Sequence, residues 1–235
     1  MIKSQDNSTS LNPPLHLGFI VDGNRRWARE RGLPTLEGHR KGFKKVEMVI
    51  EELAKAKIPF ASFYLFSTEN WNRSPEEVSY LMELIQANLR SLSKKLKTLN
   101  LRCLILGHPQ CARPDIWQKL QDLATSTANN TAGTVAICFN YGGQQEIVDA
   151  VNRLDPSRIG QITLTEFASH LYHPEVPPVD MIIRTSGEQR LSGFMLWRAA
   201  YSEFYFLPKY FPELTPKDVT NIIAEYHSRH RRFGK

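Results

Sequence analysis

The sequence predicts an α/β protein, a single domain with a mostly parallel central sheet flanked by helices. Short apolar runs typical of buried strands alternate with segments whose apolar residues recur every three or four positions, and short loops join them. The 235 residues are enough for one continuous core and few for two. The chain shows no internal repeat and no internal linker.

Strands are expected wherever a short apolar run ends in turn-forming or polar residues. The first covers residues 15–21 and stops at Asp22, Gly23 and Asn24, which indicates a strand-to-helix junction. The other strands are predicted over residues 60–66, 101–107, 135–141, 180–184 and 194–197.

Helices are predicted between these strands. One runs from about His39, with apolar residues at helical spacing as far as Leu53. Another starts at Ser74, where a capping box and a proline at the first helical position precede apolar positions that extend to Leu96. The remaining helices are expected around residues 116–123, 147–154 and 215–226.

The composition indicates an ordinary globular protein that attracts anions. Apolar residues make up 41% and charged residues 23% of the chain, and the formal charge is +6. This charge is compatible with nucleic acid, acidic lipid or phosphorylated small molecules as partners. No apolar run approaches the roughly 18 residues that a membrane span needs, and the three cysteines form no CxxC pair. A soluble protein in a reducing cytoplasm is therefore expected.

The chain is expected to begin with a flexible leader. Residues 1–14 are polar and end in Pro13 and Pro14, so folding should start near Leu15. The folded catalytic domain is predicted to cover residues 15–235.

The polar segment after the first strand has the chemistry of an anion site. It contains Asp22, Gly23, Asn24, Arg25, Arg26 and Trp27. Glycine allows close approach of the backbone to a ligand, a helix that begins here directs its free amides at an anion, and arginine offers a two-pronged contact to phosphate. For a bare Asp-Gly-Asn tripeptide, a simple turn with a surface arginine pair would be the better explanation.

Two other predicted strands end in comparable segments. Residues 66–73 bring several hydrogen-bonding side chains and Arg73 to the same edge of the sheet, and residues 183–192 place two arginines and two serines around a glycine turn. A second anion site is inferred at the latter. Further on, Glu203 lies among aromatic and apolar neighbours, as a salt-bridge partner or as a metal ligand together with Asp22.

In combination, these segments resemble the cis-prenyltransferase family, whose best-known members make undecaprenyl diphosphate, a lipid carrier of bacterial cell-wall synthesis. The resemblance runs from about His16 to Gly234 and includes Gly38-His39, Phe139-Asn140-Tyr141-Gly142-Gly143 and Arg231-Arg232-Phe233-Gly234. Each motif alone is weak, whereas all of them in this order are specific. The resemblance implies a magnesium-dependent isoprenyl transferase. Its implied reaction is the cis condensation of isopentenyl diphosphate with an allylic diphosphate, such as farnesyl or geranyl diphosphate, to a polyprenyl diphosphate.

The resemblance also implies roles for individual residues. Asp22 is the catalytic aspartate that engages Mg²⁺ and helps the allylic diphosphate leave, Glu203 is the second metal-associated carboxylate, and Asn70 is assigned to proton removal. The residues implied at the allylic diphosphate are Gly23, Asn24, Arg25, Arg26, Trp27 and His39. Those implied around Asn70 are Ser67, Thr68, Glu69, Trp71 and Arg73. Those implied at the isopentenyl diphosphate are Arg184, Arg190, Leu191 and Ser192.

Three positions depart from the family's pattern. Leu65 stands where many long-chain members have alanine, which predicts a narrower tunnel and a product shorter than eleven isoprene units. Thr35 stands where many relatives carry a diphosphate-binding arginine, so that contact is not carried over. Arg25 replaces a frequent glycine.

The sequence also bears on three alternative functions. A trans-prenyltransferase is disfavoured because no DDxxD signature occurs, and a nucleic-acid-binding module because no such motif occurs. A noncatalytic accessory subunit of a heteromeric transferase stays open, although such subunits usually lose the aspartate that is present here as Asp22. The family forms dimers, so a homodimer is expected. The closing Arg232-Phe233-Gly234 tail resembles a segment that reaches the partner's active site, and the alternative is a frayed basic terminus. A transient membrane contact for product release is also expected.

Overall fold

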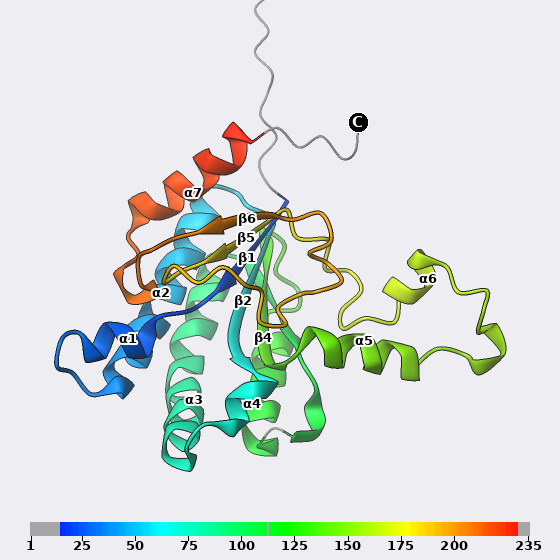
Figure 1. Ribbon diagram of the computed structural model, residues 1–235, viewed down its shortest axis with the longest axis horizontal. Helices are drawn as coiled ribbons and strands as arrows, with labels where there is room; N and C mark the ends of the chain where they lie inside the picture. The colour runs from blue at the N-terminus through cyan, green and yellow to red at the C-terminus, as the bar shows by residue number, and fades with distance from the viewer. Residues whose placement is uncertain (1–14, 112, 230–235) are drawn as a thin grey trace, which may run out of the picture.

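The structure, a computed structural model, describes residues 15–111 and 113–229 (Figure 1). The predicted leader and the closing motif at residues 231–234 lie outside the described residues. Within the described part of the chain, no helix is both long enough and apolar enough to cross a membrane.

A parallel sheet forms the centre of the protein. The described residues contribute six strands in the order β3-β4-β2-β1-β5-β6, and every neighbouring pair is parallel. Their bounds are β1 His16–Ile20, β2 Phe60–Ser67, β3 Leu101–Leu106, β4 Gly133–Tyr141, β5 Met181–Arg184 and β6 Glu203–Phe206. The single α/β domain with a parallel sheet is therefore confirmed.

Helices connect these strands. They are α1 Asn24–Arg29, α2 Thr35–Lys55, α3 Pro75–Thr98, α4 Pro114–Ser126, α5 Gly143–Asn152, α6 Leu164–Ala168 and α7 Pro216–Ser228. Four short 3-10 helices are also present among the described residues, of which η1 (Thr68–Asn72) directly follows β2. The helix predicted from about His39 begins four residues earlier, at Thr35, because its partly exposed first turn carries little apolar periodicity.

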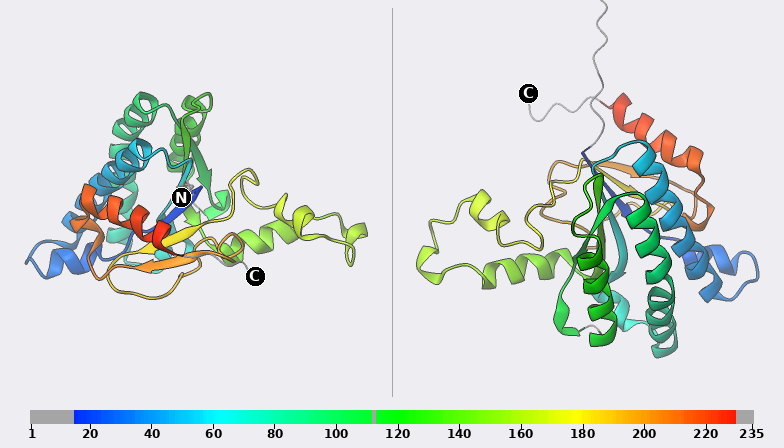
Figure 2. Two further views of the ribbon diagram at one scale, coloured as in Figure 1. Left: turned by 90° about the horizontal axis from the view of Figure 1, so that it is seen from above. Right: turned by 180° about the vertical axis from the view of Figure 1, so that it is seen from behind.

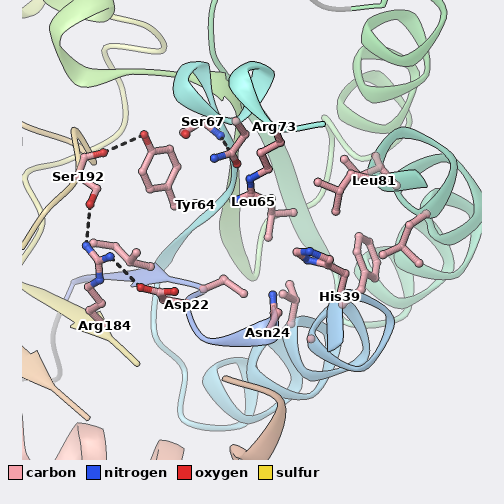
Figure 3. A pocket seen from close by; sticks show the side chains of 18 of the residues that line it. Asp22, Asn24, His39, Tyr64, Leu65, Ser67, Arg73, Leu81, Arg184 and Ser192 are labelled. Atoms are coloured by element: carbon pink, nitrogen blue, oxygen red, sulfur yellow. Dashed lines mark hydrogen bonds and ion pairs between the residues drawn. The ribbon is translucent and has the colours of Figure 1, made fainter. Parts of the chain in front are cut away.

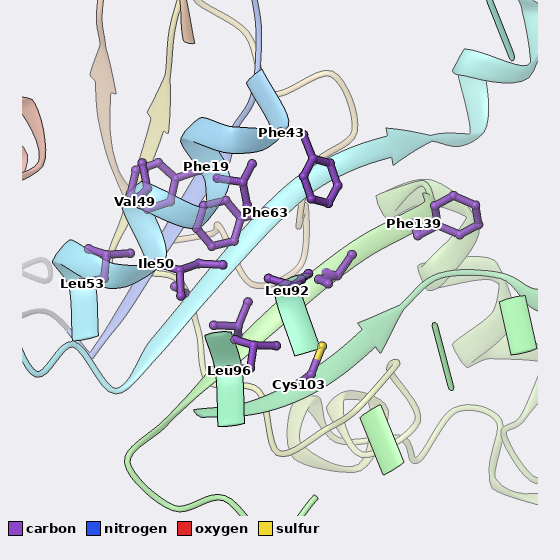
Figure 4. Close-up of a cluster of buried hydrophobic side chains, with 14 of the residues drawn as sticks. Phe19, Phe43, Val49, Ile50, Leu53, Phe63, Leu92, Leu96, Cys103 and Phe139 are labelled. Atoms are coloured by element: carbon purple, nitrogen blue, oxygen red, sulfur yellow. The ribbon is translucent and has the colours of Figure 1, made fainter. Parts of the chain in front are cut away.

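The two faces of the sheet are covered differently. On one face, α2, α3, α4 and α7 pack against the strands and bury an apolar core that includes Phe19, Phe63 and Phe139 (Figure 4). On the other face, the cover is a turn-rich segment whose buried residues include Tyr172 and Phe194. The segment with α5 and α6 extends away from this body in all three views (Figures 1 and 2).

The strand predicted over residues 194–197 is wrong, because this segment forms turns. Ser192, Gly193 and Met195 have positive φ angles of 49°, 79° and 47°, which an extended strand does not allow. Phe194 is nevertheless fully buried and stacks on Tyr64 with ring centroids 5.0 Å apart. The apolar run therefore reflects burial against the sheet, and the sixth strand is β6 instead.

Candidate active site

The junction between β1 and α1 places Asp22 at the carboxyl edge of the sheet. Gly23 follows with φ 97°, and a Cβ atom there would lie 2.5 Å from Tyr210 Cδ1 and 2.9 Å from Ser186 Cβ. Only glycine therefore fits between these neighbours in this conformation. The Gly23 amide donates to Asp22 Oδ1 at 2.6 Å, which orients the carboxylate.

Asp22 pairs with arginines from two elements. Arg184 Nη2 at the end of β5 lies 2.8 Å from Asp22 Oδ2, and Arg26 Nη2 in α1 lies 3.3 Å from Asp22 Oδ1. Burial by itself raises the pKa of Asp22, but the hydrogen bond and charge of Arg184, the Gly23 amide and the charge of Arg26 outweigh it. The net pKa is lowered, so Asp22 is ionised at neutral pH.

Arg184 also organises the loop after β5. Its side chain is almost fully buried, and Nη1 donates to the Arg190 carbonyl at 2.5 Å and to Ser192 Oγ at 2.8 Å (Figure 3). Glu188 in the same loop accepts from Arg26 at 2.7 Å and pairs with Arg190. This loop therefore holds Arg190 and Ser192 beside Asp22.

The end of β2 supplies the opposite wall. Asn70 Oδ1 accepts from the Ser67 amide at 3.1 Å, so the carboxamide folds back over the start of η1. Arg73 follows η1 and pairs with Glu77 Oε1 at 2.9 Å. With its oxygen directed at the Ser67 amide, this side chain offers its NH₂ group as a donor to the space beside it.

Glu77 connects three elements around the site. Besides Arg73, it lies 3.3 Å from Arg25 Nη1 of α1 and 3.3 Å from His39 Nε2 of α2. Burial and the charge of Arg73 lower the pKa of His39 to about 4 despite Glu77, so the imidazole is neutral at pH 7. His39 therefore acts as a neutral hydrogen-bonding group.

Two adjoining pockets lie among these residues. One has a volume of about 420 Å³ and is lined by Asp22, Gly23, Asn24, Arg25, Arg26, Arg29, His39, Arg73, Glu188 and Arg190 among others. The second, of about 260 Å³, shares Asp22, Asn24, His39, Arg73 and Arg190 with it and adds Ser67, Asn70, Arg184 and Ser192. The two pockets together form one polar cleft rich in arginine.

The second pocket has an apolar end. Its lining includes Phe43 and Val46 of α2, Leu65 of β2, and Leu81, Leu84 and Ile85 of α3. In Figure 3, Leu65, Leu81 and His39 lie toward one side, and Asp22, Arg184 and Ser192 lie toward the other. A ligand with a charged head and an apolar tail matches this division.

Two buried polar atoms of this cleft have no hydrogen-bond partner among the described residues. They are Asn24 Oδ1 and Arg184 Nε. Buried polar atoms are normally satisfied, and an unsatisfied one calls for an explanation such as an absent ligand, ion or water. Both lie in residues that line the 260 Å³ pocket, which fits a polar ligand there.

The structure brings most, but not all, of the predicted site residues together. Those that line neither pocket are Glu203, which is described below, and Trp27, Thr68, Glu69, Trp71 and Leu191, which lie beside the site. Trp27 stacks under Arg31 at 4.9 Å, and Leu191 packs against the apolar cover of the sheet. Trp71 packs edge-on against Phe66 with centroids 4.8 Å apart.

Glu203 does not meet Asp22 within the chain. It begins β6, where it pairs in register with Met181 at the start of β5, while Asp22 follows the end of β1. About five residues of strand rise separate the two levels, roughly 16 Å. Glu203 Oε2 instead accepts from Arg229 Nη1 at 3.1 Å. The expectation that one chain supplies both carboxylates to a shared metal is therefore not supported.

Several residues in or beside the pockets are not predicted from the sequence. Glu77 lines neither pocket and is expected only as part of the cap of the helix that starts at Ser74, although its position four residues after Arg73 is a spacing typical of an ion pair. Arg29 and Glu188 carried no signal beyond their charge. Tyr64 donates to the carbonyls of Tyr141 and Ser192, both at 3.2 Å, a long-range contact that no local pattern reveals.

The oxygen atoms of the cleft are suitable ligands for an Mg²⁺ ion that also binds substrate phosphates. Mg²⁺ takes oxygen ligands and is usually held by one or two carboxylates together with substrate phosphates and waters. Among the described residues, no cluster of three or more His, Cys, Asp or Glu forms a dedicated metal cage. Asp22 supplies one ionised carboxylate in the arginine-rich cleft, and the unpartnered Asn24 Oδ1 supplies a neutral oxygen nearby.

Comparison with known proteins gives one consistent result. Residues 20–234 match the prenyltransferase family described as "Putative undecaprenyl diphosphate synthase". The chain is 41% identical over 225 residues to an isoprenyl transferase of Thermotoga maritima, covering 94% of this chain and 97% of that protein. It is 40% identical over 230 residues to a trans,polycis-polyprenyl diphosphate synthase of Thermobifida fusca, covering 94% and 80%.

A solved structure agrees. The lavandulyl diphosphate synthase of Lavandula x intermedia, determined in complex with dimethylallyl diphosphate, superimposes with a TM-score of 0.89 at 30% identity. The match covers 95% of this chain and 99% of that one.

Proposed function

This chain belongs to the undecaprenyl diphosphate synthase family of prenyltransferases, and we propose that its cleft condenses isopentenyl diphosphate in cis with an allylic diphosphate. The protein is an isoprenyl transferase that elongates prenyl chains. Farnesyl and geranyl diphosphate are the proposed starters. The observation that carries the proposal is the single cleft in which Asp22 and six arginines open onto an apolar end.

Charge explains why so many arginines are needed. Two diphosphates bring about five or six negative charges near neutral pH, and like charges at short range repel strongly. The cleft offers Arg25, Arg26, Arg29, Arg73, Arg184 and Arg190. We assign the allylic diphosphate to the side of α1 and His39, and the isopentenyl diphosphate to Arg184, Arg190 and Ser192.

Asp22 has the central place in the chemistry. Its ionised carboxylate, aimed by Gly23 and Arg184, would hold Mg²⁺ on the allylic diphosphate. When bound, the metal would neutralise charge that develops on the leaving diphosphate. Arg26 and Arg184 already contact Asp22, so their donors lie where that charge appears and stabilise the transition state more than the ground state.

Asn70 is proposed as an orienting group near the proton that leaves after the new bond forms. An amide has no useful pKa near neutrality and is a poor base. Its NH₂ group can instead position a diphosphate oxygen that takes the proton. If Asn70→Ala keeps near-normal turnover and substrate affinity, this role is wrong.

The apolar end of the pocket would receive the growing chain. Each isoprene unit buries five carbons, worth roughly 3 to 4 kcal/mol at about 0.8 per methylene, so an intermediate is retained between additions. We propose that Leu65, which faces this end, limits the product to fewer than eleven units.

The test is direct. Purified protein receives labelled isopentenyl diphosphate with geranyl, farnesyl or longer starters, with and without Mg²⁺, and the products are sized. We expect elongation that needs the metal and that is lost in Asp22→Ala with the fold intact. A folded wild-type protein that elongates no starter would refute the proposal. No observation on the described residues favours the accessory-subunit alternative, and Asp22 is in place.

We propose that the enzyme is a homodimer assembled through the segment with α5 and α6. Val148 and Val151 of α5 are half exposed, and Leu164 of α6 is 76% exposed. An apolar groove next to them is lined by Ile147, Leu164, Thr165, Ala168, Leu196, Trp197 and Ala200. Contiguous exposed apolar surface of this kind marks interaction sites.

Light scattering tests the homodimer. We expect a dimer for the wild-type protein, a monomer for Val151→Asp combined with Leu164→Asp, and a dimer for the control Leu33→Asp, which changes an exposed leucine elsewhere. A monomeric wild-type protein at micromolar concentration would contradict the assembly. The proposed contact of the closing tail with a partner's site lies outside the described residues.

A cytoplasmic location is also proposed. Cys103 and Cys138 are buried free thiols, which persist most readily in a reducing compartment. Recovery of the protein from an oxidising compartment instead would contradict this location.

A further inference from the structure

The ends of β2 and β4 pair irregularly beside the active site. Tyr64 is opposite Cys138, Phe66 is opposite Phe139, and Ser67 is opposite Tyr141. Leu65 on β2 and Asn140 on β4 are therefore each an extra residue in the ladder. Such bulges re-aim side chains and are common next to active sites. The bulge at Leu65 faces the pocket, which leaves the purpose of the bulge at Asn140 to be explained.

Asn140 has an unusual conformation for a buried residue. It is fully buried, and its φ of 49° lies in the left-handed region. Such a backbone costs of order 1–3 kcal/mol at most residue types and persists where surrounding contacts demand it. Asparagine tolerates the region better than most, so the residue suits the conformation.

The Asn140 carboxamide joins two loops. Its Oδ1 accepts from Trp71 Nε1 at 2.7 Å, and its Nδ2 donates to the His108 carbonyl. The His108 amide donates back to the Asn140 carbonyl at 3.0 Å. His108 Nδ1 in turn lies 2.7 Å from Asp149 Oδ2 of α5, so this side of the bridge is anchored.

Trp71 passes this constraint to the active site. It lies in the 3-10 helix η1, next to Asn70 and two residues before Arg73. Its ring packs edge-on against Phe66, and the Asn140 hydrogen bond sets the rotation of the indole. Asn70 and Arg73 line the pocket, whereas Trp71 and Asn140 do not.

We propose that Asn140 is a positioning residue that fixes Trp71 and thereby the orientation of the η1 turn that presents Asn70 and Arg73 to substrate. The inference deepens the proposed function and rests on it. This role would explain the bulge at Asn140, a residue that does not line the pocket.

Three variants separate this role from general stability. Asn140→Gly keeps the left-handed backbone and removes the carboxamide. Asn140→Asp keeps the acceptor for Trp71 and removes the donor to His108. Trp71→Phe removes the indole donor and keeps an aromatic ring. The matched control is Asn100→Gly, because Asn100 also has a positive φ, 53°, and bridges to Thr131 away from the pocket.

Steady-state assays on each variant give kcat and KM for condensation. Nitrogen-15 NMR follows the indole N–H resonance of Trp71 in the variants that keep this tryptophan. We expect Asn140→Gly and Trp71→Phe each to lower kcat about tenfold or more, a loss of about 1.4 kcal/mol, with the double variant no worse than either single one. Asn140→Asp recovers part of kcat. Asn140→Gly shifts the indole resonance, and Asn100→Gly changes neither quantity.

The outcomes separate the two proposals. Wild-type values of kcat and KM in Asn140→Gly, additive losses in the double variant, or an unmoved indole resonance would each overturn the positioning role. If Asn140→Gly does not fold, Trp71→Phe decides, and wild-type kcat and KM there would overturn the role as well. Wild-type protein that performs no condensation would instead refute the proposed function, and the indole resonance would still test the Trp71 contact.

Discussion

Leu65 and Phe43 together should set the length of the product. Leu65 is the extra residue of the β2 bulge, and Phe43 faces the same pocket from α2, one turn after His39. Truncating leucine to alanine removes about three carbon atoms and truncating phenylalanine removes about six, compared with about five in an isoprene unit. Leu65→Ala alone therefore frees less than one unit. The double variant frees about nine carbons, which is more than one unit and less than two.

The assay sizes the dephosphorylated products of labelled isopentenyl diphosphate with geranyl or farnesyl starter. We expect Leu65→Ala to broaden the product distribution toward longer chains and the double variant to lengthen the main product by one isoprene unit. Leu89→Ala is the control, because Leu89 is buried in α3 but does not line this pocket. Unchanged product length in the double variant would show that these residues do not close the tunnel.

Three further predictions concern the site and the core. Asp22→Asn should lower turnover at least about a hundredfold. The pKa of Asp22 is lowered from 3.8, so wild-type turnover should show no Asp22 titration between about pH 5 and 8. A rate-controlling pKa in that range that vanishes in Asp22→Asn would contradict the assignment. Gly23→Ala should destabilise the protein by about 1–3 kcal/mol, because position 23 has a positive φ and the added Cβ would clash with Tyr210. A urea-unfolding midpoint equal to that of the wild-type protein would show that the loop adapts. Burial lowers the pKa of His16 to about 4, so as the pH falls below 6.5 the unfolded chain takes up a proton on His16 before the folded protein does. The free energy of unfolding should therefore be about 2 kcal/mol lower at pH 5 than above pH 6.5. In urea unfolding, His16→Gln should lose less stability over the same pH interval.

Local patterns predicted most of the sheet and the position of the site. Strands such as β2 and β4 are apolar along their length because both faces of a parallel sheet are buried, and the polar residues after them mark the carboxyl edge. For residues 194–197 the same reasoning predicted a strand wrongly. Its apolar residues are buried by packing on the sheet face, and nothing in local apolarity distinguishes that burial from a strand.

The site was predictable where chemistry and position coincide. Arg184 ends β5, Asp22, Arg26 and Asn70 come shortly after β1 and β2, and the structure brings all four to one cleft. The position of Glu203 could not be predicted in this way. Glu203 lies at the amino end of β6, away from the cleft, and this depends on the register between β6 and β5. Glu77 illustrates another limit, since its contacts with Arg25 and His39 join residues far apart in the chain.

The central claim is that two diphosphate groups share one cleft beside an apolar tunnel. A crystal structure of the protein with Mg²⁺, isopentenyl diphosphate and an unreactive thiolo analogue of an allylic diphosphate tests it most directly. We expect one diphosphate against Arg25, Arg26 and Asp22, the other against Arg184, Arg190 and Ser192, and the hydrocarbon tail between Leu65 and Leu81. Diphosphates bound on separate surfaces, or a tail that points away from α2 and α3, would contradict the account.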